Sequence, residues 1–152
     1  ATHKHSDDLS FELFEHGALL FVDTGKYAYL DDAMRSYVTS LNAHNTVGLA
    51  ALQMDLSDTE PYGPTGLSKL QKTDDGYLIE GEVVRKPFSH RRQWLYRPGR
   101  YLVIVDHLKA PSQQAYAQYF TLASDIPEPT VDDRAVKIAH TRERTATLDV
   151  LS

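Results

Sequence analysis

The chain has 152 residues, a length that fits one domain with a sizeable core. Hydrophobic residues make up 41% of it, a normal share for a globular protein that argues against disorder. Cysteine is absent, which excludes disulfides and thiolate zinc sites, so any bound metal must be held by histidine, aspartate or glutamate. The formal net charge of −5 argues against a nucleic-acid partner, and no apolar run approaches the ~20 residues of a membrane span.

Apolar and polar residues alternate with a period of two along most of the chain, which predicts strands rather than helices. The expected strands, in chain order, lie around Phe11–Leu13, Leu19–Val22, Tyr77–Val83, Trp94–Tyr96, Tyr101–Val105, Tyr116–Phe120, Ala135–Ala139 and Thr145–Leu151. A helical turn is expected within Asp31–Ser40. The run Tyr101–Val105 is apolar on both faces, which is typical of a central strand.

Turn sequences separate these strands. His16-Gly17, Asp74-Asp75-Gly76 and Arg97-Pro98-Gly99-Arg100 have the composition of hairpin turns. Residues 57–66 and 124–133 contain several prolines or glycines and are expected to be long loops. Many short strands at regular spacing predict an all-β fold, an antiparallel β-sandwich, and one domain over residues 1–152.

Two histidines near the start of the chain and two later polar residues are candidates for a metal site. His3 and His5 would point to the same face of a strand, so two imidazoles can share one site. Asp23 ends an apolar strand, and His44 precedes another. Zinc accepts such nitrogen and oxygen ligands at ~2.0–2.2 Å. By spacing alone, the alternative that these are separate surface residues stays open.

The same segments resemble the C-terminal domain of the heparinase II/III-like family. The resemblance is specific over residues 3–47, in His3-Lys4-His5-Ser6-Asp7-Asp8, Leu20-Phe21-Val22-Asp23-Thr24-Gly25, Tyr27-x-Tyr29 and Ala43-His44-Asn45-Thr46-Val47, and is looser after about residue 110. The family includes lyases of heparin, heparan sulfate and alginate, and members linked to bacterial exopolysaccharides. Where many members continue with Val-Asp-Gly, this chain has Gly48-Leu49-Ala50-Ala51, which puts the substrate class in doubt.

The resemblance implies a β-sandwich that follows an N-terminal helical (α/α) toroid, so the chain is expected to be part of a longer protein and inactive alone. It implies His5, Asp23 and His44 as the ligands of a zinc ion. It also implies that His3 lines the substrate cleft and that Tyr29 takes part in catalysis, with Tyr27 as a competing match. A structural role of the metal is favoured over a catalytic one. A periplasmic or secreted location is expected for the parent protein.

A basic segment, with Arg91 and Arg92 as the expected substrate-binding residues, is a candidate for contact with an acidic polysaccharide. The alternative is a solvated strand face with ordinary charge pairs. Trp94 and Tyr96 alternate along the same strand and are interpreted as packing residues rather than sugar-stacking ones. A non-catalytic carbohydrate-binding or structural domain remains the alternative to a lyase.

Overall fold

The structure is a computed structural model that describes residues 5–50, 62–86, 88–132, 135–141 and 144–149. The elements in its first half are β1 (Leu13–Glu15), β2 (Ala18–Phe21), α1 (Ala33–Thr39), a 3-10 turn (Leu41–Ala43) and β3 (Val47–Leu49). The later strands are β4 (Thr65–Lys72), β5 (Tyr77–Val84), β6 (Ser89–Arg97), β7 (Tyr101–Lys109), β8 (Tyr116–Gln118), β9 (Thr130–Asp132), β10 (Ala135–Thr141) and β11 (Arg144–Asp149).

The largest sheet has the order β4-β5-β6-β7, and every pair in it is antiparallel. Its strands follow one another through tight hairpins, because each connection carries residues suited to a turn. Thr73 N donates to Gly76 O at 2.9 Å in the first hairpin, and Arg100 N donates to Arg97 O at 3.0 Å in the last. Both hairpins predicted from the turn sequences are therefore confirmed.

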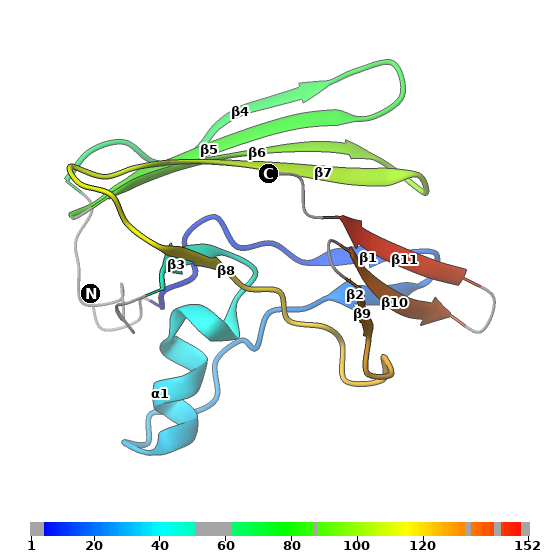
Figure 1. Cartoon of the computed structure of the whole chain (residues 1–152), viewed down its shortest axis with the longest axis horizontal. Helices are drawn as coiled ribbons and strands as arrows, with labels where there is room; N and C mark the ends of the chain where they lie inside the picture. Colours follow the sequence, from blue (N-terminus) through cyan, green and yellow to red (C-terminus); the bar gives the residue numbers. More distant parts are fainter. Residues whose placement is uncertain (1–4, 51–61, 87, 133–134, 142–143, 150–152) are drawn as a thin grey trace.

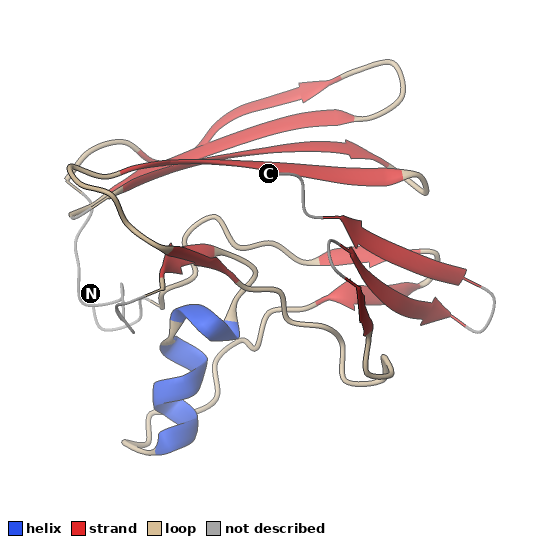
Figure 2. Cartoon of the chain, viewed as in Figure 1, coloured by secondary structure: helices blue, strands red, loops and turns tan. Residues whose placement is uncertain are grey.

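Three small antiparallel sheets face the four-stranded sheet across the molecule (Figure 1). They have the orders β1-β2, β3-β8 and β11-β10-β9. Between β1 and β2, His16 and Gly17 both have positive φ values, of 51° and 84°, as a two-residue turn of the hairpin-closing type requires. Two layers of antiparallel strands with few helices confirm the predicted all-β sandwich (Figure 2).

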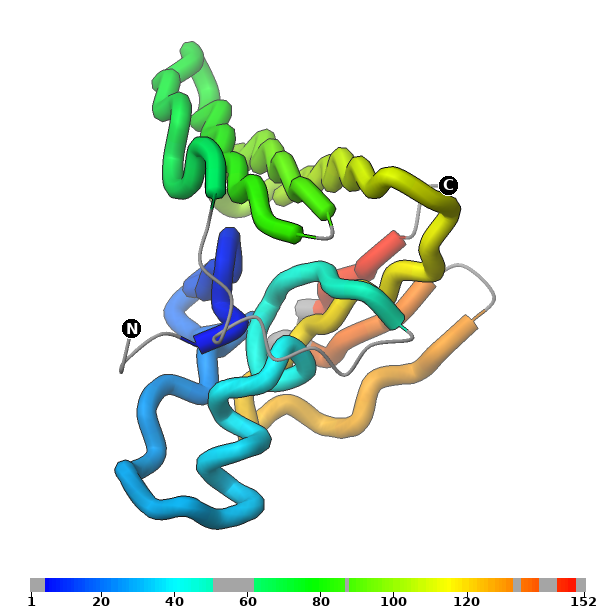
Figure 3. The backbone as a smooth tube through the Cα atoms, turned by 90° about the vertical axis from the view of Figure 1, so that its left-hand side faces the viewer, coloured from blue at the N-terminus to red at the C-terminus, as the bar shows by residue number. Residues whose placement is uncertain are grey.

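The helix α1 lies outside these layers, and its limits follow from capping. The Asp32 carboxylate accepts a hydrogen bond from Arg35 N at 2.8 Å, as an N-cap residue does. The helix ends where Ser40 donates from its backbone and side chain to Tyr37 O. The backbone then turns through the 3-10 segment into His44 and β3 (Figure 3). The helical turn expected within residues 31–40 is confirmed, and none of the described helices is long and apolar enough to cross a membrane.

Two apolar clusters form the core of the described residues. Leu20, Phe21 and Ile138 are at most 5% exposed and pack against partly buried apolar residues such as Phe11 and Phe120. A second cluster contains Leu41, Leu49 and Phe88. Burial of such side chains contributes roughly 1.5–3 kcal/mol each. The core therefore joins β2 to β10 and the 3-10 segment to β3.

Three strand assignments differ from expectation. β4 occupies residues 65–72, partly where a loop was expected. The sequence did not predict this strand, because its eight residues are all exposed and carry no apolar alternation. The short β9 lies within the second expected loop. The apolar strand β7 lies at the edge of its sheet in the described part of the chain, not at the centre.

Candidate metal and substrate site

A buried histidine and a partly exposed aspartate form the centre of the site. Asp23 follows the end of β2, and its Oδ1 accepts a hydrogen bond from Gly25 N at 2.7 Å. Gly25 has a φ of 62°, which a glycine adopts without steric cost. The other carboxylate oxygen, Oδ2, lies 2.7 Å from His44 Nδ1. The local turn thus aims the Asp23 carboxylate at an imidazole that is 0% exposed.

The ring of His5 lies beside this pair. Its centroid is 5.8 Å from that of His44, and its Nε2 lies 3.4 Å from Nη1 of Arg35 in α1. Burial lowers the pKa of His5, and the positive charge of Arg35 adds to this, although Asp7 and Asp23 act in the opposite direction. A neutral imidazole is the form that binds a metal.

The donor set suits zinc, with two imidazoles and one carboxylate. The Nε2 of His44 is buried and has no hydrogen-bond partner among the described residues, which is unusual for a buried polar atom. Within the described ranges, however, no group of three or more such side chains stands close enough to hold an ion. His5 would have to turn from Arg35 toward His44 and Asp23 to complete the set.

Tyr29 lies close to this group through the same arginine. The guanidinium carbon of Arg35 is 5.7 Å from the centroid of the Tyr29 ring, and Lys26 Nζ is 3.8 Å from it. Tyr29 is 64% exposed, so its ring is accessible to a large substrate. Tyr27, the competing match, is also exposed, at 49%. Arg35 thus joins Tyr29 to His5, and Lys26 adds a second positive charge beside Tyr29; the sequence analysis had singled out neither cation.

The Asn45 side chain binds backbone groups of three segments near His44 and Asp23. Its Nδ2 donates to Phe11 O at 2.7 Å and Val22 O at 3.0 Å, and its Oδ1 accepts from Thr121 N at 2.7 Å. Asn45 is 0% exposed and adjoins His44, while Val22 adjoins Asp23. One amide side chain therefore fixes both segments that carry the predicted ligands.

Arg92 supports the same segment from β6. Its Nη1 donates to Asn45 O at 2.6 Å and Leu9 O at 2.9 Å, and its Nε and Nη2 bind the Asp106 carboxylate at 2.7 and 3.0 Å. Arg92 is 0% exposed. The Arg92 guanidinium is buried and its N–H groups already bind protein acceptors, so this position argues against the polysaccharide contact expected for Arg92.

Asp106 is the counter-ion at the centre of that network. Burial raises its pKa, but the hydrogen bonds from His90, at 2.7 Å, and from Arg92 outweigh this and hold the pKa at about 2. Asp106 is therefore ionised at neutral pH. The network ties β6 and β7 to the segment of His44. His90 and Asp106 lie in segments that resemble the family, but no role in a site was assigned to them from sequence.

Arg91 points to the opposite face of the sheet, because neighbouring residues on a strand alternate in direction. It is paired with Glu80 on β5, and its side chain is 49% exposed. Its hydrogen bond to Glu80 raises the pKa of Arg91 and lowers the pKa of that carboxyl group. Arg91 and Arg92 thus do not form one patch. Trp94, at 6% exposed, is a core residue, as expected.

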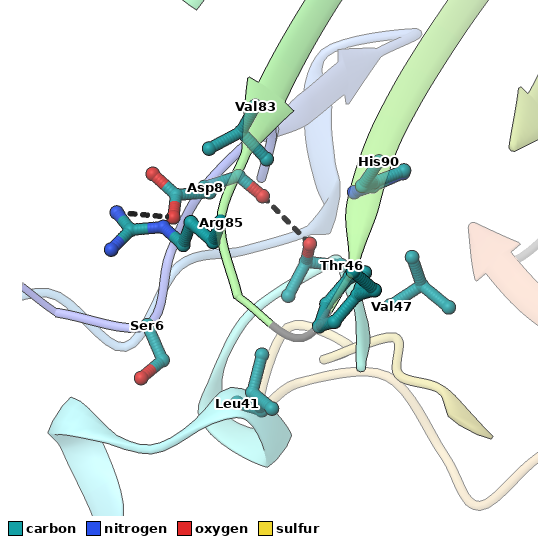
Figure 4. Close-up of a pocket in the computed structure, with 9 residues that line it drawn as sticks. Ser6, Asp8, Leu41, Thr46, Val47, Val83, Arg85 and His90 are labelled. Atoms are coloured by element: carbon teal, nitrogen blue, oxygen red, sulfur yellow. Dashed lines mark hydrogen bonds and ion pairs between the residues drawn. The ribbon is translucent and has the colours of Figure 1, made fainter. Parts of the chain in front are cut away.

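A small cavity lies beneath the His44–Val47 segment (Figure 4). Asp8 and Arg85 face each other beside it with Oδ2 and Nη2 2.7 Å apart, and Thr46 Oγ1 donates to Asp8 O at 2.7 Å. Its volume is about 10 Å³, space for about one water molecule. The cavity is too small for a sugar, so it belongs to the packing beneath the site.

The outcome for the predicted residues is mixed. His5, Asp23, His44 and Tyr29 lie in one connected group, whereas Arg91 lies on the other face of the sheet and Arg92 is buried. His3 lies outside the described residues. Arg35 was missed because a single arginine in a short, mostly exposed helix carries no spacing signal.

Comparisons with known proteins agree on one family. The family described as heparinase II/III-like, C-terminal, matches residues 1–150. A heparin-sulfate lyase from Bacteroides stercoris is 29% identical over 112 residues, which is 70% of this chain and 16% of that protein. A solved structure of heparinase III superposes with a TM-score of 0.69 at 21% identity, over 88% of this chain and 21% of that one. The chain therefore spans less than a quarter of the length of either relative.

Proposed function

This chain belongs to the heparinase II/III-like C-terminal family, and from that membership we propose that it is the metal-carrying domain of a polysaccharide lyase. The lyase would cleave an acidic, uronate-containing polysaccharide by β-elimination. The remainder of the protein would include an N-terminal toroid, and the whole would work in the periplasm or outside the cell. Supporting this, the two relatives described above are a heparin-sulfate lyase and a heparinase III.

The observation that carries the proposal is the contact between His44 and Asp23, with His5 beside them. A buried imidazole with an orphan nitrogen, a carboxylate at 2.7 Å and a second imidazole 5.8 Å away supply the donors of a zinc site. A bound zinc ion would stabilise the fold by joining these three segments and would also add positive charge near the substrate. Asn45 and Arg92 would keep the His44 backbone in place.

The residues around Tyr29 suit the chemistry of elimination. In that reaction a base removes the proton next to the uronate carboxylate, the freed electron pair forms a carbon–carbon double bond, and the bond to the leaving O4 breaks with uptake of a proton. Lys26 and Arg35 place positive charge beside Tyr29, where it can attract the uronate carboxylate of a substrate. The Tyr29 hydroxyl would exchange a proton with the substrate, and His3 would line the same cleft.

Lyase activity is tested on the full-length gene product. Incubation with heparin, heparan sulfate and alginate should produce the ultraviolet absorbance of an unsaturated uronate with at least one of them. Tyr29→Phe should abolish this absorbance, whereas Tyr27→Phe, a matched change two residues earlier, should leave most of it. The opposite pattern would transfer the role to Tyr27, and no absorbance with any uronate polymer would refute the lyase proposal.

A second candidate is a non-catalytic domain that binds carbohydrate or only stabilises its parent. One observation favours it, the contact between Arg35 Nη1 and His5 Nε2. In this position His5 Nε2 faces a guanidinium instead of a metal ion. Under this proposal the full-length protein still binds an acidic polysaccharide, but it releases no unsaturated product. Arg91 on the exposed sheet face would then contribute to binding, and Arg91→Ala should weaken it more than Arg97→Ala.

A further inference from the structure

The strand β7 has the composition of a central strand but an edge position. The residues Tyr101, Val103 and Val105 point to one face, and Leu102 and Ile104 to the other, so the strand is apolar on both sides. In the described part of the chain it pairs only with β6. Every second residue of β7 therefore directs its backbone N–H and C=O groups away from β6, toward the open side of the sheet.

The opposite edge of the same sheet shows what a protected edge looks like. β4 carries Lys69 and Lys72, a register shift between Leu67 and Lys69, and Gly66 at a φ of 108°. Lysines and bulges are the features that keep an edge strand from pairing with another strand. β7 is nine residues long, keeps an unbroken register with β6, and has no proline and no charge before Asp106. Over Tyr101–Val105 the β7 edge lacks these protecting features, and the charged residues of β7, Asp106 and Lys109, lie in its second half.

A cleft of about 740 Å³ runs along the unprotected edge. Tyr101–Ile104 of β7 form one wall, Thr145–Asp149 of β11 form another, and Phe21, Phe120 and Ile138 lie among its apolar lining. β11 is itself the last strand of its sheet, and it lies below β7 in Figure 1. Two sheet edges thus border one cleft of mixed polar and apolar lining, between layers that a sandwich normally closes.

We propose that the β7 edge and this cleft receive an additional β-strand from a part of the parent protein outside these 152 residues. A strand satisfies both features of the site, because its backbone pairs with the β7 amides and carbonyls while its apolar side chains fill the cleft. A sugar chain would leave those backbone groups without regular partners.

The source of the strand follows from the size of the relatives. This chain covers 16% of the lyase and 21% of the heparinase III chain, so in a parent of that kind most of the polypeptide lies outside the residues described here. A strand in the same polypeptide docks intramolecularly, with an effective concentration of roughly millimolar. A second copy of this chain has no such advantage. The inference depends on the proposed function in one respect, that this chain is part of a longer protein.

Hydrogen–deuterium exchange tests the proposal with β4 as an internal control. In the 152-residue chain, alternate β7 amides should exchange as fast as the free-edge amides of β4. In the full-length gene product, those β7 amides should be protected by roughly 100-fold or more, as amides that exchange only through local unfolding are, and β4 should not change. Equal exchange of β7 in both proteins would overturn the proposal.

Two further outcomes concern the occupant. Protection of β7 in the 152-residue chain that rises with protein concentration would identify a second copy, and protection independent of concentration would place the partner within this chain; either result overturns the proposal.

A variant gives a second test. Val103→Lys should lower the melting temperature of the full-length protein and change that of the 152-residue chain little, whereas Leu67→Lys on β4 should change neither melting temperature. Because exchange and lyase activity are separate readouts, an active enzyme with an unprotected β7 refutes only the docking proposal.

Discussion

Replacing Asn45 with alanine tests how the site is held together. The change removes three hydrogen bonds, to Phe11 O, Val22 O and Thr121 N, from a residue that is 0% exposed. Each buried partner left without a hydrogen bond costs about 1–3 kcal/mol. Because a water molecule can enter the space of the amide, the expected total is roughly 3–6 kcal/mol, a large part of the ~5–15 kcal/mol by which domains are stable.

The assay is urea denaturation of the 152-residue chain. With a denaturant dependence of roughly 2 kcal/mol per molar urea, the midpoint of Asn45→Ala should fall by about 1.5 to 3 M. Asn42→Ala is the matched control, because Asn42 lies three residues earlier on an exposed surface, where substitutions change stability by about 0.5 kcal/mol or less.

A conservative variant separates the loss of volume from the loss of hydrogen bonds. Asn45→Asp keeps the acceptor for Thr121 N but turns a carboxylate oxygen toward two backbone carbonyls, so it should not rescue stability. A midpoint shift below about 0.5 M for Asn45→Ala would refute the role of this side chain as the clamp of the site.

Three further predictions concern the surrounding network and the metal. Asp106 has a pKa of about 2 instead of the ordinary 3.8, so its ionisation contributes roughly 2 kcal/mol to stability, which is present above about pH 4 and lost as the pH falls through 2. Asp106→Asn should therefore flatten the acid limb of a curve of stability against pH, and an unchanged limb would contradict this. Arg92→Met should cost about 3–5 kcal/mol in urea denaturation, because it leaves the Asp106 carboxylate without its bidentate partner, and a cost under ~1 kcal/mol would make the pair dispensable. Chelation of bound metal should lower the melting temperature of the chain, and an identical melting curve would remove the metal from the account of folding.

Local sequence patterns predicted much of the fold. The hairpins at Asp74–Gly76 and Arg97–Arg100, and the turn at His16-Gly17, follow from residues whose backbone preferences act within a few positions. β4 was missed because a fully exposed strand has no apolar alternation to reveal it. The edge position of β7 was not predictable from the same pattern. Alternation shows which faces of a strand are apolar, but it does not show which other strands lie beside it.

The site was predictable only in part. His5, Asp23, His44 and Tyr29 were found through the resemblance of their segments, and the structure places them in one connected group. The arginines show the limit of this approach. Arg91 and Arg92 are neighbours in sequence, yet the alternation of a strand sends one to an exposed face and the other to a buried carboxylate 14 residues away. Such long-range pairing leaves no trace in a single sequence.

The zinc content of the purified chain and of its ligand variants tests the central claim most directly. The wild-type chain should bind about one zinc per molecule. His44→Ala and Asp23→Ala should bind almost none, while His107→Ala, which changes an exposed histidine outside the site, should match the wild type. Equal zinc in the wild type and the His44 and Asp23 variants, or none in the wild type, would contradict the proposal that His5, Asp23 and His44 form a metal site.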